Sequence, residues 1–317
     1  MLVNDIRLFS GTANRPLALQ IAKKLKMKLS KAEVLRFSDG EIRVEITENV
    51  RGSTAYIIQP ACAPTNDSLM ELILLADALR RSSVGKIIAV IPLFPYSRQD
   101  RRPGYSRVPI SARVVADMIE SVGISHVVTV DLHATQIQGF FHIPIDNISA
   151  TQLFVADIYA KYSDENPIIV SPDVGGVARA RSLAKHLNNL ELAIVDKRRP
   201  SAGVAEVMNI IGDVHGKCCI IVDDMCDSGG TICKGADALI AKGASKVVAY
   251  ATHGVLSGGV LDNLNNSELF ELVVTDTIPL RSELKSCKKI RVLSMAGLLA
   301  ETVNCIHHNK SISDLLD

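Results

Sequence analysis

Short apolar runs alternate with amphipathic segments along most of the chain. Strand-like runs occupy residues 55–59, 86–91, 127–130 and 168–170, and helix-like segments occupy residues 69–81, 111–121 and 177–187. Runs that are apolar at consecutive positions are typical of parallel strands buried on both faces, and repeated alternation of strand and helix predicts a mostly parallel sheet flanked by helices. The pattern therefore predicts an α/β fold, in which ligands bind beyond the carboxyl ends of the strands.

One stretch of the first half recurs in the second half. Residues 121–134 align without gaps on residues 241–254, and Gly, Ser, a Val-Val pair and His fall at matching positions. Because each stretch combines the end of a helix, a glycine turn and a strand, the repeat predicts two domains of the same fold. We place the first domain at residues 1–148 and the second at residues 149–317.

Three carboxylates and a run of small residues follow the apolar segment 218–222. A helix is predicted from residue 232 to residue 242, so backbone N–H groups and hydroxyls of residues 228–231 can bind a phosphate at its amino end. Asp223, Asp224 and Asp227 would repel a bare phosphate unless they accept hydrogen bonds from hydroxyl groups or act through a metal ion. A sugar phosphate satisfies both demands. We favour it over a turn with capping acids, because three clustered acids do not serve packing.

Composition narrows the class of protein. A chain of 317 residues is long for one core, which agrees with two domains. A net charge of +1 gives no general attraction to nucleic acid or to an anionic membrane. No apolar stretch of about 18 residues and no basic, apolar leader is present, so we expect a cytoplasmic protein. The seven cysteines include no C-x-x-C pair, which argues against a disulfide framework and against a zinc site.

Two segments carry clustered cations. Arginines 98, 101, 102 and 107 form a local patch suited to polyphosphates, and Phe94 or Tyr96 could stack on a base; a solvated surface loop is the alternative. Residues 194–203 begin as a strand and continue into a cationic segment that could close over a polyphosphate as a lid carrying Lys197 and Arg199, or form a plain surface loop. The fingerprints of P-loop and Rossmann nucleotide sites are absent.

Two further polar residues follow predicted strands. His133 follows the strand 127–130 and could bind a metal or a phosphate, but His253 holds the equivalent place in the repeat, so one of the two could be structural. Asp173 precedes Gly175 and Gly176, whose backbone N–H groups could face a diphosphate while Asp173 holds Mg²⁺. A helix-capping aspartate is the alternative for Asp173.

These loops together resemble the ribose-phosphate diphosphokinase family, in its phosphate-dependent bacterial form. The resemblance runs essentially end to end and includes the segments 37–41, 94–100, 130–133, 136–141, 171–173, 196–199 and 222–231. It implies two phosphoribosyltransferase-like domains, the first on the ATP side and the second on the ribose 5-phosphate side, with the substrates meeting at their junction. The implied reaction transfers the β,γ-diphosphoryl group of ATP to the C1 hydroxyl of ribose 5-phosphate, for nucleotide, histidine and tryptophan biosynthesis.

The resemblance also implies roles for individual residues. The ATP-binding residues would be Asp39, Gly40, Glu41, Arg98 and Gln99, in part across a subunit interface. Ribose 5-phosphate would be bound by Arg199, Asp223, Asp227, Ser228, Gly229, Gly230 and Thr231. His133 and Asp173 would be associated with Mg²⁺, and Lys197 and Arg199 would be the catalytic cations.

Regulation and assembly follow from the same resemblance. Arg51, Ser311 and Ser313 match positions that the family uses for phosphate or ADP control, with inorganic phosphate as activator. Ser228 stands where the family often has Thr, and His142 replaces a commonly acidic residue. The family forms homohexamers built from dimers, and we expect the last ~15 residues to pack back on the first domain.

Two other functions compete with this interpretation. The acidic loop alone also fits a phosphoribosyltransferase that consumes phosphoribosyl diphosphate, but the duplicated domain and the segment beginning at Lys197 favour synthesis. The other alternative is a non-catalytic regulatory relative. The retention of Lys197, Arg199, His133 and Asp173 argues against it.

Overall fold

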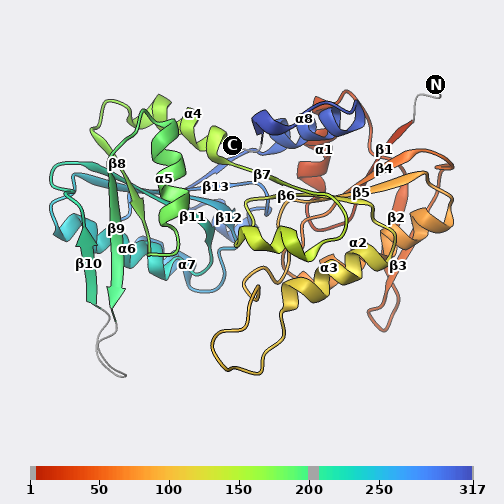
Figure 1. The fold of residues 1–317 in the computed structure, drawn as a ribbon, viewed down its shortest axis with the longest axis horizontal. Coiled ribbons are helices and arrows are strands. Elements are labelled where there is room, and N and C mark those ends of the chain that lie inside the picture. Colours follow the sequence, from red (N-terminus) through yellow and green to blue (C-terminus); the bar gives the residue numbers. More distant parts are fainter. Residues whose placement is uncertain (1–4, 199–206, 316–317) are drawn as a thin grey trace. The chain divides into compact units, whose positions relative to one another are not determined.

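A computed structural model of the protein describes residues 5–198 and 207–315, and these form two compact units (Figure 1). The first unit runs to Ser149 and also takes up Thr277–Pro279 and the segment that begins at Ser294. The second unit begins at Ala150, runs to Asp276 and includes Leu280–Leu293. None of the helices within the described ranges has the length and apolar character to cross a membrane.

The first unit is built on a parallel sheet with the strand order β1-β4-β5-β6-β7, beside a separate antiparallel hairpin of β2 and β3. Its strands are β1 (Ile6–Ser10), β2 (Ala32–Arg36), β3 (Ile42–Ile46), β4 (Thr54–Ile58), β5 (Lys86–Ile91), β6 (His126–Val130) and β7 (Ile145–Ile148). Its helices are α1 (Arg15–Lys24), α2 (Thr65–Arg81), α3 (Ser111–Ser121) and α8 (Ala296–His307), with short 3₁₀ turns at Thr135–Phe140 and Ser313–Leu315.

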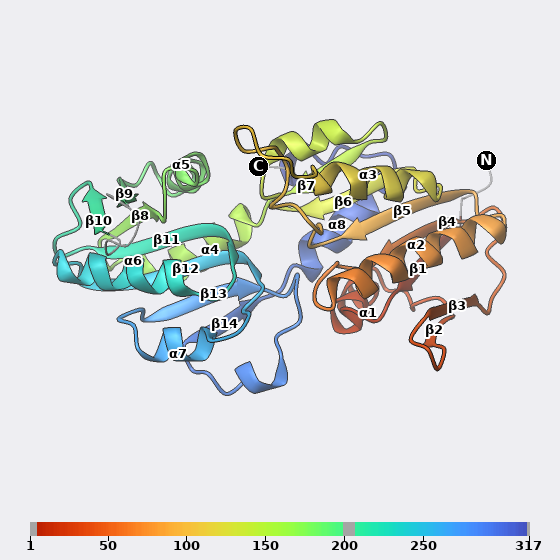
Figure 2. The ribbon, with the colours of Figure 1, turned by 90° about the horizontal axis from the view of Figure 1, so that it is seen from below.

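Helices cover the sheet of the first unit, and its central strands β4, β5 and β6 are therefore buried. Alternate strand residues such as Ile57 and Ala89 pack with Leu72 of α2 and Ile119 of α3 in one apolar cluster. The C-terminal helix α8 lies beside α1 (Figure 2). Residues from the two ends of the chain thereby build one unit.

The second unit has a longer sheet with the order β10-β9-β8-β11-β12-β13-β14, in which β10 runs antiparallel to β9 and the other pairs are parallel. Its strands are β8 (Pro167–Ser171), β9 (Leu192–Arg198), β10 (Val207–Ile211), β11 (Cys218–Cys226), β12 (Lys246–Gly254), β13 (Glu271–Thr275) and β14 (Ile290–Leu293). Its helices are α4 (Thr151–Tyr162), α5 (Val177–His186), α6 (Gly230–Ala241) and α7 (Val260–Asn265), with a 3₁₀ turn at Ser282–Leu284.

The structure confirms the predicted α/β class, and one central element is longer than predicted. The sequence pattern ends the strand at Val222, whereas β11 continues to Cys226. The reason is that β12 also continues, to Gly254, and pairs with β11 up to that residue. Asp223 and Asp224 therefore belong to a paired strand and not to a loop, and α6 begins at Gly230, two residues before the predicted start.

A partly buried ion cluster ties α4 to the far edge of the second sheet. The Arg291 guanidinium on β14 contacts both carboxylate oxygens of Asp157 on α4 at 2.7 Å, and Oε2 of Glu271 on β13 at 2.6 Å. The hydroxyls of Tyr250 and Tyr162 donate to Asp157 and Glu271, at 2.6 and 3.1 Å. Burial alone would raise the pKa of Asp157 and of Glu271, but the hydrogen bonds from Arg291 lower both overall. Each carboxylate is therefore stabilised in its ionised form.

We expect Arg291→Met to lower the free energy of unfolding of the second unit by about 3 kcal/mol, because it leaves two partly buried carboxylates without their cation. Since both carboxylates have lowered pKa values, their contribution exists at neutral pH and is lost as the pH falls through those values. The deficit measured by urea unfolding at pH 7 should thus shrink below about pH 4. Arg181→Met, at an exposed position on α5, is the control and should change stability by less than about 0.5 kcal/mol. An equal deficit at both pH values would contradict the role of the ion cluster.

Candidate functional site

The phosphate cradle, which we define as residues 227–231, joins the end of β11 to the start of α6. Gly229 is the N-cap of α6 and has φ +78°, a left-handed conformation that favours glycine. The N–H groups in the first turn of a helix have no partner within the helix and carry the positive end of its dipole. The cradle is therefore suited to a phosphate, as the sequence predicts.

A second loop braces this cradle. The N–H groups of Leu256 and Ser257, which follow β12, donate to the carbonyl oxygens of Cys226 and Asp227 at 3.0 and 3.1 Å. The Ser257 hydroxyl also donates to Oδ1 of Asp227, and the Asn263 amide on α7 donates to the carbonyl of Ser228 at 2.9 Å. The contacts of Ser257 and Asn263 with the cradle were not predicted from the sequence. The available signal was a second small-residue run, 257–259, after the strand next to β11.

Two acids precede the cradle on β11 and share one cation from α5. Nη1 of Arg179 lies 3.2 Å from Oδ1 of Asp223 and 3.0 Å from Oδ1 of Asp224. The N–H of Asp224 donates to Oδ1 of Asp223 at 2.9 Å. The Asp224 side chain is 6% exposed and that of Asp223 is 22% exposed, so Asp223 is the more accessible acceptor. Of the three predicted acids, Asp224 is thus buried, whereas Asp223 and Asp227 are partly exposed.

Burial and the neighbouring negative charge of Asp224 raise the pKa of Asp223 to about 7, although Arg179 opposes the shift. Desolvation disfavours a carboxylate, and two adjacent carboxylates disfavour each other. A carboxyl group with a pKa near neutrality at the end of a buried strand is typical of a functional site. The protonated form of Asp223 is therefore favoured more than that of an ordinary aspartate.

Asp173 shapes a second loop of the same unit, between β8 and α5. Its Oδ1 accepts a hydrogen bond from the N–H of Gly176 at 2.9 Å, and its carbonyl accepts one from the Ser171 hydroxyl at 2.7 Å. This contact closes a turn before α5 and does not cap the helix, because the N-cap residue is Gly176 and no side chain caps α5. The contact uses one carboxylate oxygen of Asp173 and leaves the other for a ligand.

The two histidines of the repeat differ in the structure. His133 lies beyond the end of β6 and is exposed, whereas His253 lies within β12 and is only 2% exposed. The structural alternative therefore applies to His253. Within the described residues, no group of three His, Cys, Asp or Glu side chains could hold a metal ion.

In the first unit, the predicted ATP-binding residues lie on two segments that both contact the start of α2. Asp39, Gly40 and Glu41 form the tip of the β2–β3 hairpin, where Oδ1 of Asp39 accepts from the N–H of Glu41 at 3.1 Å. Arg36 at the base of this tip pairs with Asp67 of α2 at 2.7 Å. The predicted residues Arg98 and Gln99 belong to the loop after β5 and are exposed.

The loop after β5 reaches the neighbouring residue of the same helix. The Tyr96 hydroxyl donates to Oδ1 of Asn66, next to Asp67, and Tyr96 itself has φ +56°. A positive φ is uncommon for a tyrosine and is often found at functional sites. Neighbouring residues of α2 therefore hold both the hairpin and the loop.

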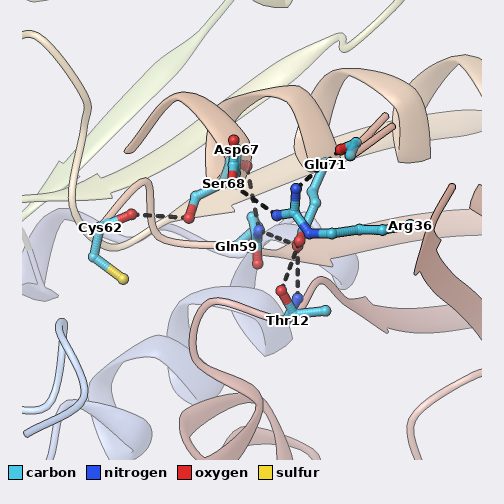
Figure 3. A network of polar contacts seen from close by, with 8 residues as sticks. Thr12, Arg36, Gln59, Cys62, Asp67, Ser68 and Glu71 are labelled. Carbon is cyan, nitrogen blue, oxygen red and sulfur yellow. Dashed lines mark hydrogen bonds and ion pairs between the residues drawn. The ribbon is translucent and has the colours of Figure 1, made fainter. Parts of the chain in front are cut away.

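A buried polar network fixes α2 to the sheet (Figure 3). Glu71 is 4% exposed and accepts hydrogen bonds from the N–H and the hydroxyl of Thr12, at 2.8 and 2.6 Å, and from the Gln59 amide at 2.8 Å. The Ser68 hydroxyl donates to the carbonyl of Cys62 at 2.8 Å. Donors from Gln59, directly after β4, and from Thr12, in the loop after β1, thus satisfy the Glu71 carboxyl oxygens and tie α2 to the sheet.

The remaining predicted residues fall on β9 and on the rim of the first unit. Lys197 lies on β9, with its backbone opposite Met208 of β10, whereas Arg199 lies outside the described residues. Arg51 lies in an exposed turn before β4. Ser311 and Ser313 are exposed and hydrogen bonded to each other at 2.9 Å, and they belong to the first unit, as does Arg51.

Comparisons with known proteins find matches over nearly the whole chain. A family model for the N-terminal domain of ribose phosphate pyrophosphokinase matches residues 6–123, and one for the phosphoribosyl synthetase-associated domain matches residues 201–317. A ribose-phosphate pyrophosphokinase from Pasteurella multocida is 58% identical over 98% of both chains, and one from Haemophilus ducreyi is 56% identical over 99% of both.

A solved structure gives the same result for the fold. The crystal structure of phosphoribosylpyrophosphate synthetase from Mycobacterium smegmatis is 41% identical, covers 96% of this chain and 99% of its own, and superposes with a TM-score of 0.91. Relatives this similar over nearly their full length share one family. From its matching domains, its curated relatives and its fold, the chain belongs to the ribose-phosphate pyrophosphokinase family.

Proposed function

We propose that the protein is a ribose-phosphate diphosphokinase, which transfers the β,γ-diphosphoryl group of ATP to the C1 hydroxyl of ribose 5-phosphate. The products are 5-phosphoribosyl 1-diphosphate and AMP. The observation that carries the proposal is a phosphate cradle directly beside carboxylates, in a chain whose relatives of this name match nearly end to end. A phosphoribosyltransferase that consumes the product is not favoured, because those relatives cover both units.

Ribose 5-phosphate is assigned to the second unit, residues 149–317. Ser228, Gly229, Gly230 and Thr231 would bind its phosphate end, through N–H groups and hydroxyls at the start of α6, and Asp227 would face the sugar hydroxyls. Asp223 would accept hydrogen bonds from the sugar hydroxyls, since an ionised carboxylate offers only acceptors and more of them than a protonated carboxyl. The two contacts together distinguish a sugar phosphate from a bare phosphate.

ATP is assigned to the first unit, residues 1–148. Arg98 and Gln99 would hold the nucleotide, and the hairpin tip with Asp39, Gly40 and Glu41 would read the adenine. Both segments contact neighbouring residues of α2. This supports the assignment, because a displacement of one segment would be transmitted to the other through α2.

Magnesium would enter with the nucleotide and not as a resident ion. Mg²⁺ keeps several waters and usually binds through one or two protein ligands and substrate phosphates. His133, an exposed imidazole of the first unit, and Asp173, a carboxylate of the second unit with one oxygen engaged, each offer a single ligand of the kind that such an ion would use beside water and substrate phosphates. When bound, Mg²⁺ neutralises charge on the phosphoryl oxygens.

Positioning and charge stabilisation account for the chemistry. In phosphoryl transfer the protein aligns the attacking hydroxyl with the bond that breaks and stabilises the negative oxygens. Lys197 and Arg199 would supply that stabilisation, and the cradle would fix the sugar so that its C1 hydroxyl points at the β-phosphorus. No side chain is assigned as a general base.

The proposal also covers the location, metabolic role, assembly and regulation of the enzyme. The enzyme would be cytoplasmic, would supply nucleotide, histidine and tryptophan biosynthesis, and would assemble into a homo-oligomer, with a hexamer as the expected form. Arg51, Ser311 and Ser313 would take part in regulation, with inorganic phosphate as activator. Nucleic acid and membranes have no place in this function.

The activity is tested by mixing the purified protein with ribose 5-phosphate, MgATP and inorganic phosphate. We expect AMP and phosphoribosyl diphosphate to form in equal amounts, and to require the sugar. The products are followed by chromatography and ³¹P NMR, and omission of ribose 5-phosphate is the control. Absence of sugar-dependent AMP would refute the proposed function.

Lys197→Ala should lower kcat roughly 10²–10³-fold, the usual effect of removing one charge-stabilising group. The Kd for ribose 5-phosphate should change little, because the proposed role of Lys197 belongs to the transition state. Steady-state kinetics and calorimetry measure the two quantities, with Lys185→Ala on an exposed turn of α5 as the control. A variant that binds the sugar poorly but retains kcat would rule out the catalytic role.

Asp223→Asn should raise Tm at pH 8 by about 2–4 °C and weaken ribose 5-phosphate binding. Because the pKa of Asp223 is raised to about 7, the folded state favours the protonated carboxyl. The contribution of the protonated carboxyl to the free energy of unfolding is lost as the pH rises toward 7. Asparagine is neutral at every pH, so the gain should be largest above pH 7 and should vanish near pH 4. Thermal unfolding at the two pH values measures it; a gain that is the same at both would be inconsistent with this charge effect.

A further inference from the structure

We propose that Arg179 is a positioning residue for ribose 5-phosphate, which acts by holding the accessible carboxylate of Asp223, beside the buried Asp224, as an acceptor for the sugar hydroxyls. The inference rests on the proposed function, and it adds a residue to which the sequence analysis gave no role in sugar binding. Arg179 lies on α5, outside the cradle and outside β11.

The geometry gives Arg179 a specific task. One nitrogen, Nη1, lies 3.2 Å from Asp223 and 3.0 Å from Asp224, so a single cation serves both acids. The backbone N–H of Asp224 also donates to Oδ1 of Asp223, the oxygen that faces Arg179. These contacts restrain Oδ1 of Asp223 from two directions. The orientation of the accessible acceptor is thereby set before the sugar arrives.

The course of the strands explains why the cation comes from α5. Pairing of β11 with β8 ends at Ile221, whereas pairing with β12 continues to Cys226. After β8 ends, its chain continues through Asp173 into α5. The side chain of Arg179 on α5 therefore contacts the last part of β11, where β8 no longer pairs with that strand. The partner of Asp223 on the other side is Ala251 of β12, which carries no charge.

Electrostatics makes this cation necessary. Two neighbouring carboxylates repel each other, and both are largely withdrawn from water, so a proton would bind to the pair if no cation were present. A protonated carboxyl loses acceptor capacity toward a hydroxyl. The charged groups that act on Asp223 are Asp224, which raises its pKa, and Arg179, which lowers it. Removal of Arg179 would therefore neutralise the acceptor at a higher pH than in the wild-type protein.

A competing role for Arg179 is direct contact with the diphosphoryl group, because α5 follows the Gly175-Gly176 turn. That role would affect the nucleotide, whereas the proposed role affects the sugar. The KM values for the two substrates and their pH dependence therefore distinguish the two roles.

The experiment compares Arg179→Met, Arg179→Lys and Arg181→Met with the wild-type enzyme. We expect Arg179→Met to raise KM for ribose 5-phosphate roughly threefold at pH 7.5 and up to roughly tenfold below pH 7, with kcat and KM for ATP nearly unchanged, because uniform binding of the sugar is lost. The pH below which KM for the sugar rises should move up by roughly one unit. Arg179→Lys should recover most of the affinity, because one nitrogen makes both contacts. Arg181→Met, on the exposed side of α5, should behave as wild type.

Calorimetry with ribose 5-phosphate alone, over the same pH range, measures the effect without turnover. An unchanged pH dependence of sugar binding in Arg179→Met, or a rise in KM for ATP alone, would overturn the inference. If Arg179→Met does not fold, Arg179→Gln and Arg179→Lys provide the same comparison. A wild-type protein that forms no AMP would refute the proposed function, while the calorimetric comparison would still decide the role of Arg179.

Discussion

The central constraint on the second unit is that β11 is buried on both faces and yet carries carboxylates near its end. Residues Cys218–Val222 are at most 2% exposed, and the strand pairs with β8 and with β12. The next residue is a carboxylate, and the strand has not ended. Desolvation of that carboxylate requires nearby donors and a cation, and the surrounding elements supply them. The cradle, the bracing loop and the position of α5 all follow from how this strand ends.

Much of the fold could be predicted because the hydrophobic pattern is local. The segments 86–91 and 111–121 coincide with β5 and α3, since apolar runs and amphipathic spacing report burial directly. The end of β11 could not be predicted in this way. Asp223 and Asp224 are polar and therefore suggest a loop, but pairing with residues 251–254 keeps them extended. A partner strand some 30 residues away overrides the local signal, as tertiary context commonly does.

The candidate site shows the same division. Small residues after an apolar strand indicated the cradle, because the backbone itself forms it. The residues that hold the cradle and its acids, among them Ser257, Asn263 and Arg179, act through contacts between segments far apart in the sequence. Their residue types are ordinary for exposed loops and helices, so their function depends on which element lies next to them. Topology, and not composition, selects them.

The division of the chain into units affects how the protein can be made. The chain passes between the two units at four places, and the first unit includes the helix α8 near the C-terminus, packed beside α1. A ribosome therefore completes the second unit's strands before it releases the last piece of the first. Until α8 has been synthesised, the apolar surface of α1 that it covers stays exposed. The N-terminal part of the nascent chain therefore completes its packing only with residues from the C-terminal end of the chain. The N-terminal part of the chain does not by itself contain the complete first unit, and a chain truncated before α8 would have a first unit with an incomplete core.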